Sequence, residues 1–276
     1  CALPISLDSA AITVSGKLGA SATVTVLDAD KDAGITIDHS VLSAGKDISI
    51  TARQHGKTEV NSYQAGISLG GALSAALAFN RSAGSTNIGI TGSAINHYGP
   101  GFTESASGNT TILAEDTGIT KTNTYGLEGA LLVSGGVMLS DTKNDSSTKV
   151  SIDTTRITSP GTTSIKADKS NTTSAYALGG AVGALTMQGT IAEAKDLGDS
   201  TVVLTGANTI KGGESLAIEA KSAPRAEAEA RSYAGSLLGA GASVANASAS
   251  GRTSVTAADG SSFAGKKVNI SAYLDQ

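Results

Sequence analysis

A short phrase recurs along this chain at a nearly constant spacing. Its first copy, at residues 45–52, has the sequence GKDISITA: a glycine, then alternating apolar and polar residues, then an alanine. Related phrases occupy residues 108–114, 161–167, 213–220 and 265–272. Their matching isoleucines are Ile50, Ile112, Ile165, Ile218 and Ile270, separated by 62, 53, 53 and 52 residues. A period of this size is typical of stacked repeat proteins, in which one unit cannot bury its apolar face alone.

The stretches between the phrases have the pattern of strands. Residues 11–14, 22–27 and 35–37 alternate apolar and polar side chains, the period of a half-buried strand. The same alternation runs from 65 to 79, with Gly70-Gly71 in the middle. Because glycine in a strand pattern marks a corner or a close backbone approach, we expect a strand, a corner and a second strand in each repeat.

One repeat is longer than the others, with 62 rather than 53 residues between isoleucines. The additional residues fall within 96–107, and the register on either side is kept. We therefore expect a loop on the outside of the stack. It holds His97, Tyr98 and Phe102, although only 3% of the chain is aromatic, which makes it a candidate contact loop. The alternative is a decorated loop without a binding role.

The composition favours a thin, regular core. The chain has 34 glycines, no tryptophan and 16% charged residues, so large side chains are too few to fill a wide interior. We predict an all-β, right-handed parallel β-helix (β-solenoid) of about five 53-residue repeats. With roughly two coils in each repeat and about 4.8 Å for each coil, the rod would be about 50 Å long.

Residues 1–276 are expected to form a single elongated β-solenoid. Both ends fall in the middle of a repeat, which suggests a segment of a longer array whose caps and export signal lie elsewhere. A stack of antiparallel hairpins, or β-prism, is the competing architecture. Tight hairpins prefer Asn-Gly or Asp-Gly turns, and neither occurs at the Gly-Gly sites.

The repeats resemble those of a known family. Residues 44–52 and 213–220 are similar to the Gly-x-x-ϕ-x-ϕ-x-Ala coils (ϕ, apolar) of filamentous-haemagglutinin-like adhesins, the large bacterial exoproteins of type V secretion. Residues 176–184, a tyrosine followed by glycines and small residues, resemble the leukotoxin-type filamentous adhesins. The resemblance implies a right-handed β-helix shaft that is secreted and displayed at the bacterial cell surface. It carries over no binding residue.

Several kinds of chemistry lack support in the sequence. The net charge of −4 argues against nucleic-acid binding, which needs a basic face. No apolar run of about 18 residues is present, so we expect no membrane insertion. The three histidines, His39, His55 and His97, lack the spacing of metal ligands. We therefore expect no catalysis and no cofactor.

One acidic stretch is a candidate cation site. Asp28, Asp30 and Asp32 occupy alternate positions, as carboxylates do in calcium-binding loops. The following glycine, Gly34, comes one position late, and no glutamate closes the loop. The alternative interpretation is a solvated acidic turn.

Two functions fit these observations. The first is the shaft of a cell-surface adhesin, with a host or neighbouring-cell protein or glycan as its partner. The second is a structural subunit that associates end to end into an extracellular fibre or matrix.

Overall fold

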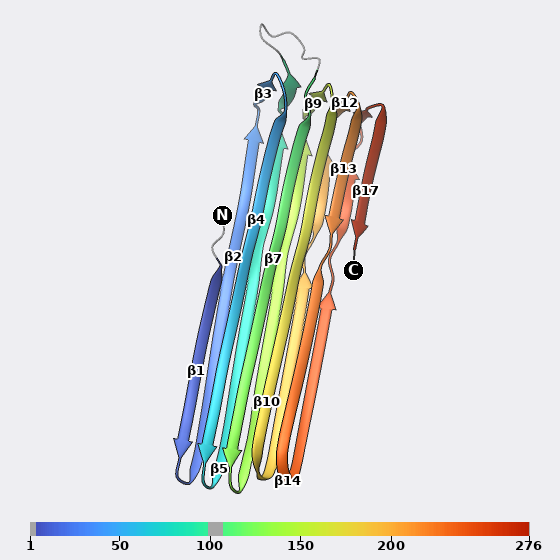
Figure 1. Ribbon diagram of the computed structural model, residues 1–276. Helices are drawn as coiled ribbons and strands as arrows, with labels where there is room; N and C mark the ends of the chain where they lie inside the picture. The colour runs from blue at the N-terminus through green and yellow to red at the C-terminus, as the bar shows by residue number, and fades with distance from the viewer. Residues whose placement is uncertain (1–3, 99–106, 276) are drawn as a thin grey trace.

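The computed structural model describes residues 4–98 and 107–275, and these form strands and no helix (Figure 1). The chain is arranged in layers. The first layer consists of β1 (Ile5–Ser15), β2 (Leu18–Asp38) and β3 (Val41–Ala44), and the second of β4 (Ile48–Ser68), β5 (Gly71–Thr91) and β6 (Ala94–His97). The third consists of β7 (Thr110–Ala130), β8 (Val133–Asp153) and β9 (Arg156–Ser159), and the fourth of β10 (Thr162–Leu197), β11 (Ser200–Thr205) and β12 (Thr209–Gly212). The fifth consists of β13 (Ser215–Ser222), β14 (Arg225–Ala249), β15 (Thr253–Ala257) and β16 (Ser262–Ala264), after which β17 (Lys267–Leu274) begins another.

Each layer pairs in parallel with the layers before and after it. Ile112 lies opposite Ile50 on one side and Ile165 on the other, 62 and 53 residues away. The chain therefore returns to the same place once in every repeat, so one repeat is one layer. The expectation of two coils in each repeat was wrong. Its physical reason is strand length: β4 and β5 have 21 residues each, far more than the 5–6 that are usual.

The dimensions change accordingly. At about 4.8 Å per layer, five layers extend roughly 24 Å along the stack, half the expected rod length. A strand of 21 residues is roughly 70 Å long at about 3.3 Å per residue. The slab is therefore widest along its strands, as Figure 1 shows.

The long strands reverse direction at one end of the slab. The chain runs along one face through β4, turns at residues 69–70 and returns along the other face through β5 (Figure 1). We call this the turn end; in the next layers it falls at residues 131–132, 184 and 237. β4 pairs with β1 and β7, whereas β5 pairs with β2 and β8, so the two arms of a layer are not hydrogen-bonded as a hairpin. This pairing excludes the hairpin stack.

The corner predicted at Gly70-Gly71 is confirmed, because this pair joins β4 to β5. A Cβ atom on Gly70 would lie 2.2 Å from the carbonyl oxygen of Lys17 in the preceding layer, so only glycine fits. In the later repeats, the corners expected at Gly135-Gly136 and Gly179-Gly180 were misplaced: both pairs lie inside strands, and the turns fall at residues 131–132 and 184.

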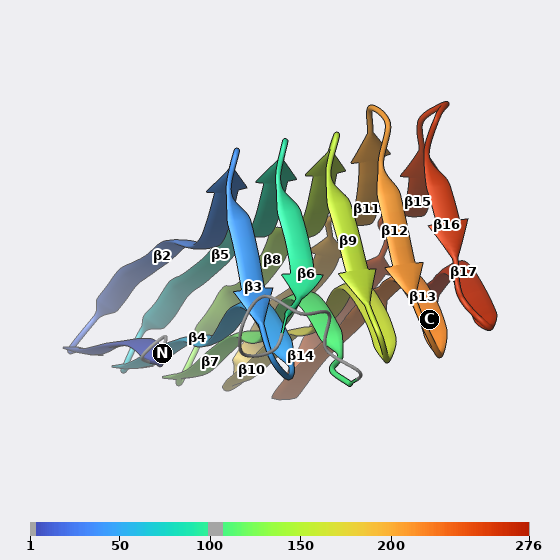
Figure 2. The same ribbon diagram turned by 90° about the horizontal axis from the view of Figure 1, so that it is seen from above.

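The opposite end is closed by a third, short sheet, in the order β16-β12-β9-β6-β3 (Figure 2). We call it the three-sided end, and the main apolar core lies inside it. The isoleucine ladder forms one wall, and the predicted pairing of Ile50, Ile112, Ile165, Ile218 and Ile270 is confirmed throughout. The first four are buried, whereas Ile270, in the last strand, is 46% exposed. The other two walls contribute Ile88, Ile90, Val150, Ile152, Val202, Leu204, Ile95, Ile157 and Ile210.

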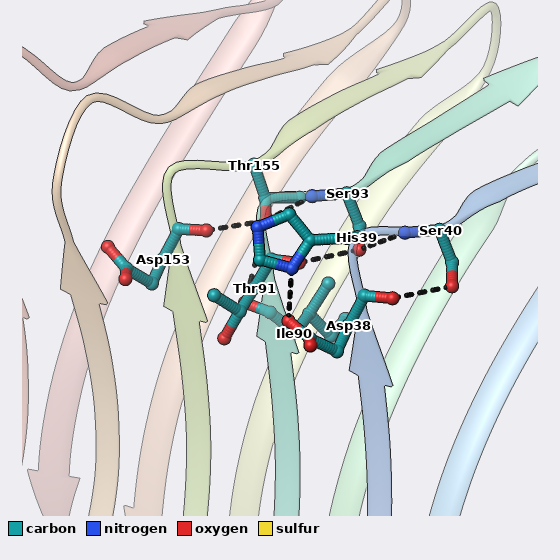
Figure 3. A network of polar contacts seen from close by, with 8 residues as sticks. All are labelled: Asp38, His39, Ser40, Ile90, Thr91, Ser93, Asp153 and Thr155. Carbon is teal, nitrogen blue, oxygen red and sulfur yellow. Dashed lines mark hydrogen bonds and ion pairs between the residues drawn. The ribbon is translucent and has the colours of Figure 1, made fainter.

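A repeated corner connects the long return strands to this short sheet (Figure 3). Ser40, Ser93 and Thr155 occupy it in successive layers, and each hydroxyl donates to the carbonyl oxygen two residues earlier. The same hydroxyls accept hydrogen bonds between layers: the Ser40 amide donates to Ser93 Oγ at 3.1 Å, and the Ser93 amide to Thr155 Oγ1 at 3.4 Å. Asn208 continues the series by accepting from the Thr155 amide at 2.9 Å.

Candidate functional site

The acidic stretch does not form the predicted turn. Asp28, Asp30 and Asp32 lie inside the long strand β2 and are exposed on its outer face. Alternate residues of a strand are about 6.6 Å apart, too far for these carboxylates to converge on one ion. Asp32 instead accepts hydrogen bonds at 2.8 Å from the amide and hydroxyl of Ser85, and these lower its pKa. Within 4–98 and 107–275, no group of three or more His, Cys, Asp or Glu residues is placed to hold a metal.

The candidate contact loop is described only at its beginning. His97 ends β6 and is buried, and its Nε2 lies 2.9 Å from the Thr110 hydroxyl. Its ring therefore packs inside the protein, whereas the sequence analysis had placed it in a loop on the outside of the stack. The amide of Tyr98 donates to the carbonyl oxygen of Ala44 in the layer below. Phe102 lies outside the described residues.

A buried polar network occupies the middle of the slab, between the two faces. The Lys169 ammonium lies 2.8 Å from an Asp196 carboxylate oxygen, and both side chains are fully buried. Asn144 and the Arg225 amide also donate to Asp196. Burial raises the pKa of Asp196, and the Lys169 charge opposes that rise. A neighbouring cluster surrounds the buried Asp116, which accepts from Ser146 and Asn171.

This network is built for structure. Its donors and acceptors come from both faces, and they link the outgoing and returning strands through the interior of the slab. The sequence analysis did not find it, because Lys169 and Asp196 lie in alternating stretches that look like exposed strand faces. The only available signal was the alternation along each strand. Lys169 and Asp196 lie two residues from Ala167 and Ala194, and so share a strand face with these buried neighbours.

An aromatic row crosses the outer face of β4, β7 and β10. Tyr63 and Tyr125 are register partners, with ring centroids 5.2 Å apart and planes 7° from parallel. Tyr176 follows at 5.6 Å from Tyr125, with its ring tilted by 49°. Burial and the neighbouring tyrosines raise the pKa of Tyr125. The row is a surface feature: Tyr125 and Tyr176 line a surface hollow together with Lys121, Glu227 and Glu229.

The row separates two kinds of outer surface. Towards the three-sided end, charged side chains are frequent, and several form exposed ion pairs such as Arg53–Glu115 at 2.7 Å. Towards the turn end, the outward side chains are apolar. Among the described residues no helix is long and apolar enough to cross a membrane.

Comparisons with protein-family models, with curated proteins and with solved structures found no match to this chain. The resemblance to filamentous adhesins therefore rests on the repeat phrases alone.

Proposed function

We propose that this chain is a section of the shaft of a secreted, cell-surface adhesin of the filamentous-haemagglutinin-like type. In this proposal the layers are the coils of a right-handed parallel β-solenoid, exported by type V secretion. The observation that supports it best is the inter-layer register, which continues without interruption from β1 to β17. A register of this kind can be extended indefinitely by adding repeats.

The distribution of stabilising contacts also suits a shaft. All the described strand pairings run between layers, so hydrogen bonds lie along the stacking axis and resist separation of the layers. The longer repeat enters this pattern without disturbing it, because β6 still pairs with β3 and β9. Such a scaffold holds a binding region at a distance from the cell and tolerates insertions at its rim. The partner is a protein or glycan on a host or neighbouring cell.

Assembly into an extracellular fibre is the second candidate. The first and last described layers each pair on one side only: β1 pairs with β4, and β17 with β13. Their outer edges present strand groups that a second copy is able to pair with, provided that the register is kept. The same geometry therefore supports end-to-end association.

Electron microscopy of the purified chain over a concentration series separates the two candidates. A shaft section gives single slabs at every concentration, about 70 Å along the strands. Long unbranched fibres that grow with concentration would replace the shaft proposal with the fibre.

Adhesion is tested separately, with fluorescent beads that carry the chain and a panel of cells. Specific binding that free chain competes away supports a direct adhesive role. If the paired change Tyr98→Ala with Phe102→Ala leaves this binding unaltered, the contact-loop hypothesis fails.

A further inference from the structure

The outer surface of the turn end is apolar on both faces and around the rim. We define the apolar margin as the exposed apolar side chains that surround this end. They are Ile12, Val14, Leu18, Ile67, Leu69, Leu73, Leu127, Leu131, Leu132, Val133, Val137, Val182, Leu185, Met187, Leu237 and Leu238. In the inner third layer, Leu127, Leu131 and Leu132 are 69%, 68% and 62% exposed. Exposure on this scale is costly in water and marks an interaction surface.

Charge is almost absent from this part of the molecule. Residues 60–80, 170–192 and 232–251 contain no Asp, Glu, Lys or Arg. Residues 122–140 contain one, Glu128, whose side chain points inward and is buried. Lys17, at the turn of the first layer, is the single outward charge of the margin within the described residues. The absence is specific to this end, because charged residues resume on both faces beyond it.

The polar side chains of this end are turned inward. The Ser68 hydroxyl donates to the carbonyl oxygen of Lys17 at 2.8 Å, and the Ser134 hydroxyl to that of Val182 at 3.0 Å. Ser74 donates to the buried Glu128. Serine, threonine and glutamine therefore lie inside together with small alanines such as Ala72 and Ala181, whereas leucine and valine lie outside. This is the reverse of the three-sided end, where isoleucines fill the interior.

The margin has an aromatic border and a defined depth. Tyr63, Tyr125 and Tyr176 stand where the apolar side chains give way to charged ones such as Glu59 and Lys121. From Tyr125 to the rim is about six residues, and from the rim to Asp141 about eight. At about 3.3 Å per residue these lengths are roughly 20–26 Å. The hydrocarbon layer of a bilayer is about 30 Å thick, and tyrosine favours its boundary with water.

We propose that the apolar margin inserts into the hydrocarbon layer of a lipid bilayer from one side, without crossing it. Strands enter lipid only when their backbone groups are satisfied within the protein. Here β4, β5, β7, β8 and β10 pair on both sides with neighbouring layers, so the inner layers meet this condition. The strands β1, β2 and β14 pair on one side only and would need a further layer over their open edges before they could enter lipid. A lipid occupant also fits the shape. Fluid acyl chains can cover two faces and a rim at once, and they can also fill the shallow apolar hollow on the return face, which is lined by Leu73, Val137 and Met187.

The earlier expectation of no membrane insertion considered only continuous apolar runs. In these strands apolar residues alternate with inward polar ones, so the surface is apolar although no long run exists. The inference is independent of the proposed shaft, because it concerns one edge of the slab and not its extension.

The absence of native tryptophan allows a direct test. Leu132→Trp places a fluorophore on the rim, and Asn87→Trp places one on the outer face near the three-sided end. Each full-length chain is mixed with vesicles of zwitterionic phosphatidylcholine. We expect a blue shift for the rim reporter, and quenching of it by lipids brominated on their acyl chains. The Asn87→Trp reporter should change little.

Two double variants that each add two charges test whether the apolar margin is the surface that binds vesicles. Leu131→Glu with Leu185→Glu adds two charges to the margin and should weaken vesicle binding at least about tenfold, because charged side chains are costly in hydrocarbon. Thr111→Glu with Asn87→Glu adds the same charge elsewhere and should bind like the parent. Circular dichroism checks that each variant is folded.

Three results would overturn the proposal. The first is equal vesicle binding by both charge variants, and the second is no vesicle binding by the unaltered chain. The third is a discrete self-associated species in sedimentation velocity that does not bind vesicles and that the margin charges abolish, which would assign the surface to a second copy. Because the readout is lipid contact, failure here would leave the shaft proposal untouched.

Discussion

At the scale of single residues, the three-sided corner shows how the same backbone is built from different side chains. The left-handed position is filled by His39, Gly92, Thr154 and Gly206 in successive layers, with φ values of 42°, 55°, 47° and 67°. Glycine adopts this conformation freely, whereas a β-branched residue such as threonine is strained in it.

Exchanging residues between two of these corners should therefore have opposite effects. We expect Thr154→Gly to stabilise the protein by about 1 kcal/mol through relief of that strain. The reverse change, Gly92→Thr, should destabilise it, because threonine is strained at a φ of 55°. Thermal unfolding of both variants checks the pair; a loss of stability in Thr154→Gly would contradict it.

The buried ion pair gives a second prediction. Lys169→Met leaves the Asp196 carboxylate buried without its counter-ion and should cost about 3–5 kcal/mol of unfolding free energy. Adding Asp196→Asn removes the uncompensated charge while keeping an acceptor for the Arg225 amide, so the double variant should recover a large part of the loss. Urea unfolding measures both. A double variant as unstable as the single one would mean that packing, and not charge, dominates.

Glu128 should make stability depend on pH. Burial raises its pKa, only partly opposed by the hydrogen bond from Ser74. Below about pH 4.3, the ordinary glutamate pKa, the carboxyl is protonated in both the folded and the unfolded chain. As the pH rises, the unfolded chain releases the proton first, so the free energy of unfolding falls until the raised folded pKa is passed.

The variant Glu128→Gln cannot release a proton. We expect it to match the parent near pH 4 and to be the more stable of the two at pH 7, in lipid-free solution. Glu227→Gln, on an exposed face, is the control and should show no such divergence. Equal stability of Glu128→Gln and the parent at both pH values would contradict the assignment.

At the scale of elements, the isoleucine ladder carries the core. Ile165→Ala removes a fully buried side chain between two paired isoleucines and should cost about 2–5 kcal/mol. Ile270→Ala is the matched control, because the same ladder position in β17 is half exposed and should cost at most about 1 kcal/mol. Chemical unfolding tests the contrast; similar losses at both sites would show that the last layer is covered in solution.

The strands also show what the sequence could and could not predict. The ladder was predictable, because a repeated glycine phrase fixes which isoleucines are in register. The offset of the tyrosines also follows from the sequence: Tyr125 comes 13 residues after its ladder isoleucine and Tyr176 comes 11, so Tyr176 lies opposite Asn123. Which face of a strand is inside was not predictable. Alternation marks two faces, and at the turn end Ile67 and Leu69 face outward while Ser68 is buried.

At the scale of the whole molecule, the number of coils was misjudged because a repeat length does not specify how wide a layer is. Fifty-three residues fill two coils of short strands or one coil of very long ones. The repeated glycine phrase does not distinguish the one-coil from the two-coil architecture, because both architectures keep the isoleucines in one ladder. The long arms also create the turn end, and with it a surface that a narrower coil would lack.

Intramolecular cross-linking tests the claim of one layer per repeat most directly. In a chain with Cys1→Ser, the outward residues Ser164 and Ala217 are replaced by cysteine. They are register partners in neighbouring strands, at a spacing of about 4.8 Å that a disulfide spans. The control pairs Ser164→Cys with Ile191→Cys, half a repeat away. We predict that mild oxidation cross-links the first pair within one chain and not the second. A cross-link between 164 and 191, with none between 164 and 217, would contradict the layered fold.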